Sequence, residues 1–315
     1  MKINEYISHN ARQFGTLLGL MGLCLILWIL TPHFLTVSNL LNVAQQTSIN
    51  AIIAVGLTFV IITAGIDLSV GSILAFAGVV LAWSLKADVP LPLALLLGLG
   101  LGTLNGLVNG ILISYGRLPP FISTLGMMSV ARGGALLFSD GRPISGFSES
   151  FRFLATGEVF YIPVPVIITG FVYIAAHFVL TRTKFGRYAY AIGGNEEAAR
   201  LSGVNVKIQK AMVYGLSGLL SGLAAIILTA RLNSAQPIAG IMYELDAIAA
   251  TVIGGTSLMG GRGTIFGTLI GALIIGVLRN GLNLLDVSPY IQQVVIGSVI
   301  IAAVLVDMAL KKKNT

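Results

Sequence analysis

Long apolar segments constrain this chain more than any other feature of its sequence. Ten of them approach the roughly 20 residues that a helix needs to cross a bilayer: 14–31, 42–64, 70–86, 91–114, 119–137, 163–181, 211–231, 244–258, 264–283 and 290–309. Only 10% of the residues are charged, whereas a soluble domain carries about 25%. The sequence therefore predicts an all-α, polytopic membrane protein with about ten transmembrane helices, of which the eighth is short.

The placement of the basic residues predicts that both termini are cytoplasmic. With that topology, 13 of the 19 basic residues fall in cytoplasmic segments, as the positive-inside rule requires. The net charge of +7 is then a topology signal and does not indicate nucleic acid. Because no small-residue cleavage site follows the first apolar segment, we expect an uncleaved first helix rather than a signal peptide.

We treat 1–315 as a single transmembrane permease domain with two notable loops. The external loop spans 138–162, and the longest cytoplasmic loop spans 182–210. These two loops are the segments outside the spans that stand out.

The cytoplasmic loop contains a predicted helix of about two turns. Asn195 is a favourable N-cap, Glu196 and Glu197 complement the helix dipole in the first turn, and Gly203 suits a left-handed stop. Such a short helix is marginal alone in water, so we expect it to dock on a partner through the side that carries Ala198 and Leu201. A membrane-surface helix and an ordinary connector are the alternatives.

Within this loop, Glu197-Ala198-Ala199-x-x-x-Gly203 resembles the E-A-A-x-x-x-G loop of bacterial ABC importer permeases, which forms the helix that couples to the ATPase. Longer segments, from about residue 31 to about residue 307, resemble the ribose-type, monosaccharide branch of these permeases. They are 45–51, 65–72, 186–188, 193–196, 234–237, 243–250, 254–258 and 280–285.

This resemblance implies a subunit that translocates a monosaccharide across the bacterial inner membrane, and D-ribose is the first candidate for that sugar. It implies a homodimer of ten-helix permeases, a periplasmic sugar-binding protein that delivers the sugar, and a separate ATPase subunit that holds ATP and magnesium. The residues expected to couple to that ATPase are Gly193, Gly194, Asn195, Glu196, Glu197, Ala198, Ala199, Arg200 and Gly203.

Polar side chains within the spans are candidates for the translocation path. Gln46 and Asn50 lie four residues apart, hence on one helix face near the external side. Their amides donate and accept hydrogen bonds, which suits a ligand rich in hydroxyl groups. Helix–helix hydrogen bonding is an equally weighted alternative. Asp67 lies at a break between spans, where we favour a helix cap or an inner gate hinge over a sugar ligand.

The fourth span carries glycines at positions 98, 102, 106 and 110, a stripe that predicts close helix packing. Asn105 and Asn109 follow an adjacent stripe and are candidates for the pore lining. On the basis of the resemblance of 280–285, we add Asn280 and Asn283 to the candidate path or gate.

Charged residues on the external side are candidates for contact with the binding protein, although ordinary solvated loop charges explain them equally well. These residues are Arg142, Arg152, Glu244 and Asp246. The glycine-rich segment 254–263 lacks the G-x-x-x-x-G-K-[ST] pattern of a phosphate-binding loop, and we expect it to form an inner turn near the gate.

No metal spacing, catalytic motif or cofactor motif is present, so we predict no catalytic site, no metal site and no enzymatic activity in this chain. The main alternative is a secondary sugar transporter driven by an ion gradient. That class would carry carboxylate, histidine or lysine relays deep in the spans, and almost none are found. A membrane enzyme would need a catalytic cluster, which is also missing from the sequence.

Overall fold

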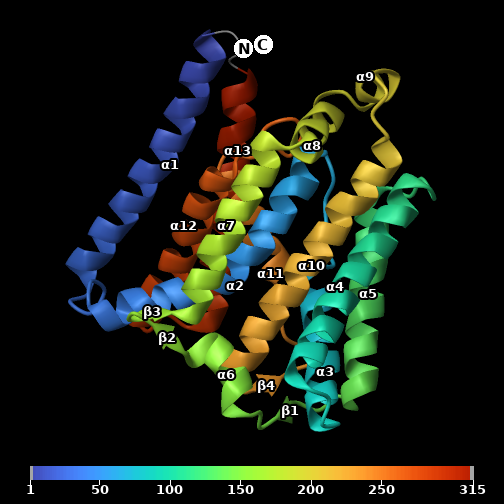
Figure 1. Ribbon diagram of the computed structural model, residues 1–315. Coiled ribbons are helices and arrows are strands. Elements are labelled where there is room, and N and C mark those ends of the chain that lie inside the picture. The colour runs from blue at the N-terminus through green and yellow to red at the C-terminus, as the bar shows by residue number, and fades with distance from the viewer. Residues whose placement is uncertain (1–2, 313–315) are drawn as a thin grey trace.

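The chain folds into a bundle of helices (Figure 1). The computed structural model describes residues 3–312, and within that range it has 13 helices and four two-residue strands. The helices are α1 (Ile3–Leu30), α2 (Val37–Ile62), α3 (Val70–Lys86), α4 (Leu91–Ser114), α5 (Pro120–Ser139), α6 (Glu149–Thr156), α7 (Val164–Arg182), α8 (Lys184–Gly194), α9 (Glu196–Leu201), α10 (Val206–Leu232), α11 (Tyr243–Ile253), α12 (Ile265–Leu284) and α13 (Pro289–Lys312). The strands are β1 (Ile144–Ser145), β2 (Glu158–Val159), β3 (Ile162–Pro163) and β4 (Ser234–Ala235).

The expected all-α membrane architecture is found, but the prediction of ten transmembrane helices is wrong. Among the described residues, six helices are long and apolar enough to cross a membrane: α2, α4, α5, α7, α10 and α12. Three further apolar helical segments are shorter: Phe14–Leu30 within α1, Val70–Lys86, which is α3, and Pro289–Ala302 within α13. The predicted eighth span, 244–258, is an 11-residue helix, which at 1.5 Å per residue covers only about half of a bilayer core of about 30 Å.

For one of the excess spans, 244–258, the overcount has a cause in the backbone. Hydropathy records how long an apolar run is, but not where the backbone leaves the helix. The run at 244–258 ends as a helix at Ile253, because Gly254 packs against the backbone of α12 and Gly255 adopts a positive φ of 91°. A glycine in this left-handed conformation ends the regular hydrogen-bond pattern.

The centre of the bundle is formed by α2 and α10, the two spans that are most buried inside the chain. The predicted glycine stripe on α4 is confirmed as a close-packing surface against α10. A Cβ atom at Gly102 would clash with the backbone of Gly218, and one at Gly110 would clash with the backbone of Ala211. Small residues let the two backbones approach closely enough for extensive van der Waals contact.

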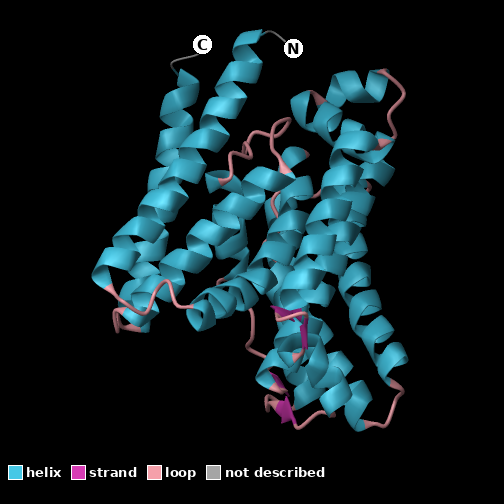
Figure 2. Cartoon of the chain, turned by 60° about the vertical axis from the view of Figure 1, so that its left-hand side comes forward, coloured by secondary structure: helices cyan, strands magenta, loops and turns pink. Residues whose placement is uncertain are grey.

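The bundle has two dissimilar ends, and we name each by the helix that marks it. The α9 end carries α8 and α9, the described start of α1 and the described end of α13 (Figure 1). The α6 end carries α6 and the short strands (Figures 1 and 2). There, β1 pairs with β4 and β2 pairs with β3, both antiparallel. The predicted loops 182–210 and 138–162 thus lie at opposite ends.

Candidate functional site

The coupling segment predicted from the sequence forms the helix α9 with the expected caps. The side chain of Asn195 accepts a hydrogen bond from the backbone N–H of Ala198 at 2.9 Å, and Gly203 adopts a φ of 85°. Arg200 pairs with Glu197 at 2.5 Å, and this hydrogen bond lowers the pKa of the Glu197 carboxyl group below its usual value. The short helix is therefore held by its own polar contacts at both ends.

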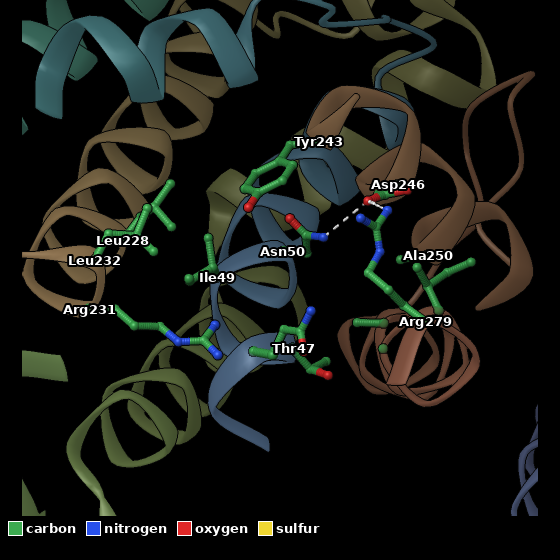
Figure 3. A pocket seen from close by; sticks show the side chains of 14 residues that line it. Thr47, Ile49, Asn50, Leu228, Arg231, Leu232, Tyr243, Asp246, Ala250 and Arg279 are labelled. Carbon is green, nitrogen blue, oxygen red and sulfur yellow. Dashed lines mark hydrogen bonds and ion pairs between the residues drawn. The ribbon is translucent and has the colours of Figure 1, made fainter. Parts of the chain in front are cut away.

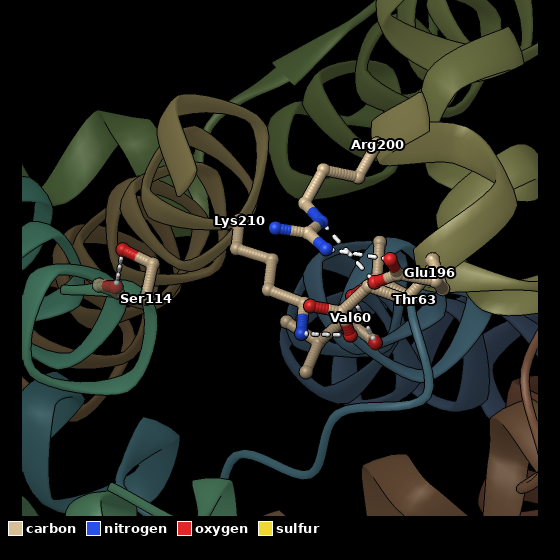
Figure 4. Close-up of polar contacts among 8 residues, drawn as sticks. Val60, Thr63, Ser114, Glu196, Arg200 and Lys210 are labelled. Atoms are coloured by element: carbon tan, nitrogen blue, oxygen red, sulfur yellow. Dashed lines mark hydrogen bonds and ion pairs between the residues drawn. The ribbon is translucent and has the colours of Figure 1, made fainter. Parts of the chain in front are cut away.

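A second ion pair fixes α9 to the neighbouring span. Lys210 of α10 donates to the carboxylate of Glu196 at 2.6 Å (Figure 4). Beneath α9, the side chain of Ala199 is buried with Ile192 and Val206. On the outer side, Ala198 is exposed and Leu201 is 78% exposed. The face expected to meet a partner is thus free of contacts from the described part of this chain.

The segment before α9 contacts the break between α2 and α3. Gly193, near the end of α8, packs so closely on the backbone of Ile62 and Gly261 that a Cβ atom there would overlap both. The N–H of Gly261 donates to the carbonyl of Ile62 at 2.9 Å, and Tyr190 donates to the carbonyl of Gly263 at 2.6 Å. The glycine-rich turn 254–263 therefore joins the coupling segment to the end of α2.

Asp67 organises a polar cluster at the same break. Its carboxylate accepts hydrogen bonds from the backbone N–H and the hydroxyl of Ser69, at 3.0 and 2.5 Å, and from the hydroxyl of Ser217 at 2.9 Å. Asn109 donates to Ser69 and accepts from Ser123. We call these five buried residues the Asp67 cluster. Ser69, rather than Asp67, occupies the N-cap position of α3.

The other asparagines proposed for the path make contacts within the helix bundle. Asn280 of α12 forms two hydrogen bonds with Asn39 of α2, at 2.8 and 3.0 Å. Asn105 donates to the carbonyl of Leu101 in its own helix, and Asn283 accepts from Gln292 of α13. Their role in a path stays a prediction, and the structure places none of the three among the residues that line the cavity described next.

A cavity of about 330 Å³ lies between α2, α10, α11 and α12 (Figure 3). Gln46 and Asn50 both line it, so two of the residues chosen from the sequence come together here. The lining also includes the apolar side chains of Ile49, Leu228 and Ile275. Its walls combine apolar and polar side chains, as in other sites for small polar ligands.

An ion pair crosses one wall of the cavity. Arg279 of α12 donates to the carboxylate of Asp246 at 2.6 Å, and Asn50 donates to the same oxygen at 3.3 Å. Asp246 is only 2% exposed, which places it inside the cavity wall. Arg231 and Tyr243 also line this space (Figure 3). Asn50 and Arg279 thus join α2 and α12 to α11 through the carboxylate of Asp246.

Sequence reasoning missed Thr47, Arg231, Tyr243 and Arg279 as parts of this site. The two arginines did carry a signal, because they are basic residues near the non-cytoplasmic ends of apolar segments. A cation in such a position needs a polar partner or a water-filled space. Nothing in the local sequence indicated that Arg279 pairs with Asp246, which lies 33 residues earlier in the chain.

The residues proposed for docking a binding protein are distributed over several environments. Arg142 is exposed beyond α5, Arg152 on α6 is half-buried and Glu244 on α11 is half-buried. Asp246 instead faces the cavity, as described above. The docking role of these residues stays a prediction.

A family model described as the permease component of the branched-chain amino acid transport system matches residues 39–304. The chain belongs to this permease family. It is similar to the ribose import permease of Haemophilus influenzae, with 50% identity over 99% of this chain and 98% of that protein. The ribose import permease of Escherichia coli K12 is 52% identical over 93% of this chain and 92% of its own length. The D-allose transport system permease of the same organism is 43% identical over 95% and 93%. No solved structure matches the chain.

Membership of the family places this permease among the membrane-spanning subunits of ABC importers. It is a multi-pass protein of the bacterial inner membrane, and it belongs to a family of proteins that transport a solute across that membrane. Among residues 3–312, no group of three or more His, Cys, Asp and Glu side chains is arranged to hold a metal ion.

Proposed function

We propose that this permease imports ribose as one half of a homodimer, while a separate ATPase subunit hydrolyses ATP with magnesium. The substrate assignment rests on the two ribose import permeases, which are 50% and 52% identical to this chain, against 43% for the D-allose permease. In this proposal the α9 end faces the cytoplasm, and a periplasmic binding protein delivers the sugar at the α6 end. The exposed Arg142 at that end is available to an acidic partner surface.

The observation that carries the proposal is the capped and outwardly unpartnered helix α9. A helix of six residues is marginal alone in water, and the exposed side chain of Leu201 leaves its outer face open to a partner. Burying Leu201 and Ala198 in a cleft of the ATPase removes that apolar surface from water. The charged pairs on the same helix then supply orientation rather than affinity.

The contacts of α8 indicate how a movement of the ATPase would reach the sugar. Any displacement of Gly193 presses directly on the backbone of Ile62, because no side chain separates the two segments. Ile62 ends α2, and α2 also carries Gln46 and Asn50 in the cavity wall. A rigid helix transmits such a displacement along its length, so closure of the ATPase dimer would move one wall of the cavity against the others.

Uptake of radiolabelled ribose into vesicles tests this function. The vesicles contain this chain, its ATPase subunit and its binding protein, and uptake is measured with and without ATP. We expect uptake that depends on both ATP and the binding protein and that unlabelled ribose competes. Uptake driven by an ion gradient without ATP would contradict the proposal, and ATP-driven uptake of another sugar would correct only the substrate.

A charge reversal on α9 tests the coupling role. Glu197→Lys places a cation at the helix N-terminus, where the helix dipole opposes it, and it removes the ion pair with Arg200. We expect normal membrane insertion with loss of ATP-driven uptake. The matched control is Glu149→Lys, the same change at an exposed position in the first turn of α6 at the opposite end. Uptake by the Glu197→Lys variant that equals uptake by the unmodified chain, at equal expression, would exclude α9 as the coupling helix.

A further inference from the structure

Buried polar atoms without partners are concentrated at the cavity. Within the described residues, five buried side-chain nitrogen or oxygen atoms have no hydrogen-bond partner, and three of them belong to residues that line it: Thr47 Oγ1, Asn50 Oδ1 and Arg279 Nε. Each such atom has lost its hydrogen bonds to water without gaining a replacement, which lowers the stability of the fold. Since native interiors rarely tolerate this cost without a reason, the clustering points to a ligand.

We propose that this cavity, within a single permease chain, is a recognition site for one monosaccharide ring. The proposal rests on the proposed function for the class of ligand, and it goes further by assigning the residues that hold the sugar. Those residues are Thr47, Asn50, Arg231, Asp246 and Arg279. The sugar therefore binds inside each protomer during transport, instead of only passing between two copies.

The chemistry of the walls matches hydroxyl groups better than a simple ion. Asp246 has only acceptors, and one of its oxygens already serves Arg279 and Asn50 while its remaining lone pairs stay available. Arg231 has only donors, and no hydrogen bond or ion pair of its side chain is found within residues 3–312. A hydroxyl group donates and accepts at once, so neighbouring hydroxyls of one ring can satisfy both walls.

The form of the cavity limits the size of the ligand. Its volume of about 330 Å³ lies at the lower end of the range of about 300–1,000 Å³ for small-molecule pockets. This volume accommodates one monosaccharide. Ile49, Leu228 and Ile275 supply apolar surface for the C–H groups of the ring, and polar side chains from α2, α10, α11 and α12 also line the space (Figure 3).

The position of the cavity suits a sugar that arrives from the α6 end. Its lining residues on α10 are among the last of that helix before β4, and two of those on α11, Tyr243 and Asp246, are in the first turn of that helix. Toward the α9 end, the other two helices of the cavity, α2 and α12, are joined by the hydrogen bond between Thr58 and Thr268, whose oxygens lie 2.7 Å apart and are fully buried. The sugar site is thus separated from the α9 end by a packed layer.

Protection of an engineered cysteine tests the site directly. In isolated membranes that contain the full chain with Cys24→Ala, Leu232→Cys places a thiol on a cavity-lining residue that is 47% exposed. The rate of its reaction with a methanethiosulfonate reagent is measured with and without ribose, allose or galactose. We expect a monosaccharide to slow labelling at this position. Ile238→Cys, which is 58% exposed and does not line the cavity, serves as the matched control and should react at an unchanged rate.

A second pair of variants assigns the protection to the named residues. Arg231→Gln in the Leu232→Cys protein should raise the sugar concentration for half-protection about tenfold or more, the loss expected for one charge-assisted hydrogen bond. Arg182→Gln is the control, since Arg182 is exposed at the far end of α7. Labelling that no monosaccharide slows, or equal slowing at Ile238→Cys, would overturn the sugar site.

These outcomes separate the site from the proposed function. Protection by allose but not by ribose would support the site and contradict ribose as the substrate. ATP-dependent ribose uptake by a protein in which no sugar protects Leu232→Cys would leave the importer function intact and overturn the site within the protomer.

Discussion

The Asp67 cluster and the cavity are both buried and polar, yet they differ in how their hydrogen bonds are satisfied. In the cluster, the carboxylate of Asp67 is fully buried and accepts three hydrogen bonds, and no atom of the cluster is among the unpartnered atoms of the described residues. In the cavity, Thr47, Asn50 and Arg279 each keep one atom without a partner. Both regions are therefore buried and polar, and they differ in whether every buried polar atom has a hydrogen-bond partner.

This difference separates a structural role from a binding role. A fully bonded network joins helices and resists change, because every lost bond leaves a buried group unpaired. An incompletely bonded set costs stability and keeps its capacity for a ligand. We therefore assign the Asp67 cluster to holding α3, α4, α5 and α10 at the break after α2, and the cavity to the sugar.

Removing the centre of the satisfied cluster should have the largest effect on stability. Asp67→Ala leaves the hydroxyls of Ser69 and Ser217 and one backbone N–H without their acceptor. We expect the free energy of unfolding to fall by about 3 kcal/mol or more, measured as a lower melting temperature in detergent. Asp67→Asn keeps a carbonyl acceptor and should lose less.

The opposite result for Asp67→Ala would contradict the structural role of the cluster. If Asp67→Ala melted like the unmodified chain but failed to transport ribose, the cluster would belong to the binding machinery, and satisfaction of hydrogen bonds would not separate the two regions.

A smaller effect is expected where a single satisfied hydrogen bond joins two helices. Thr58 of α2 donates to the carbonyl of Ala54 and shares a hydrogen bond with Thr268 of α12. Thr58→Val keeps the shape of the side chain and removes both contacts. Hydrogen bonds between membrane helices contribute about 0.6 kcal/mol on average, so we expect the free energy of unfolding to fall by about 0.5–1 kcal/mol, measured by the same melting assay. Sugar protection of Leu232→Cys should be unchanged, and a loss of it would place Thr58 in the site.

The sequence predicted local features of this molecule well and long-range features poorly. The caps of α9 at Asn195 and Gly203 depend on neighbouring residues, and both were predicted correctly. The glycine stripe on α4 follows helical spacing, and its close packing was also correct. The number of transmembrane helices was not, since it depends on where the backbone breaks, as at Gly255.

The candidate site shows the same division. Helical spacing placed Gln46 and Asn50 on one face, and both line the cavity. Asn280 has the same side-chain chemistry, but it pairs with Asn39, which lies 241 residues away in the chain. The partner of a buried amide is decided by tertiary packing, so residue type alone could not tell a ligand-facing asparagine from one that joins two helices.

The smallest effect on stability is expected at Thr47. A substitution there also tests directly whether an unpartnered buried hydroxyl group serves the ligand or the fold. This residue lies on the same helix as Thr58, but its buried hydroxyl group has no partner. Because Thr47→Val replaces an unbonded oxygen with a methyl group of similar size, the free energy of unfolding should be unchanged or rise by up to about 1 kcal/mol. Ribose protection of Leu232→Cys should weaken nonetheless. The two threonine variants thus predict opposite outcomes in the melting and protection assays. If Thr47→Val lowered stability as Thr58→Val does and left protection intact, the unpartnered hydroxyl group would be part of the fold, and the cavity would lose one of its sugar contacts.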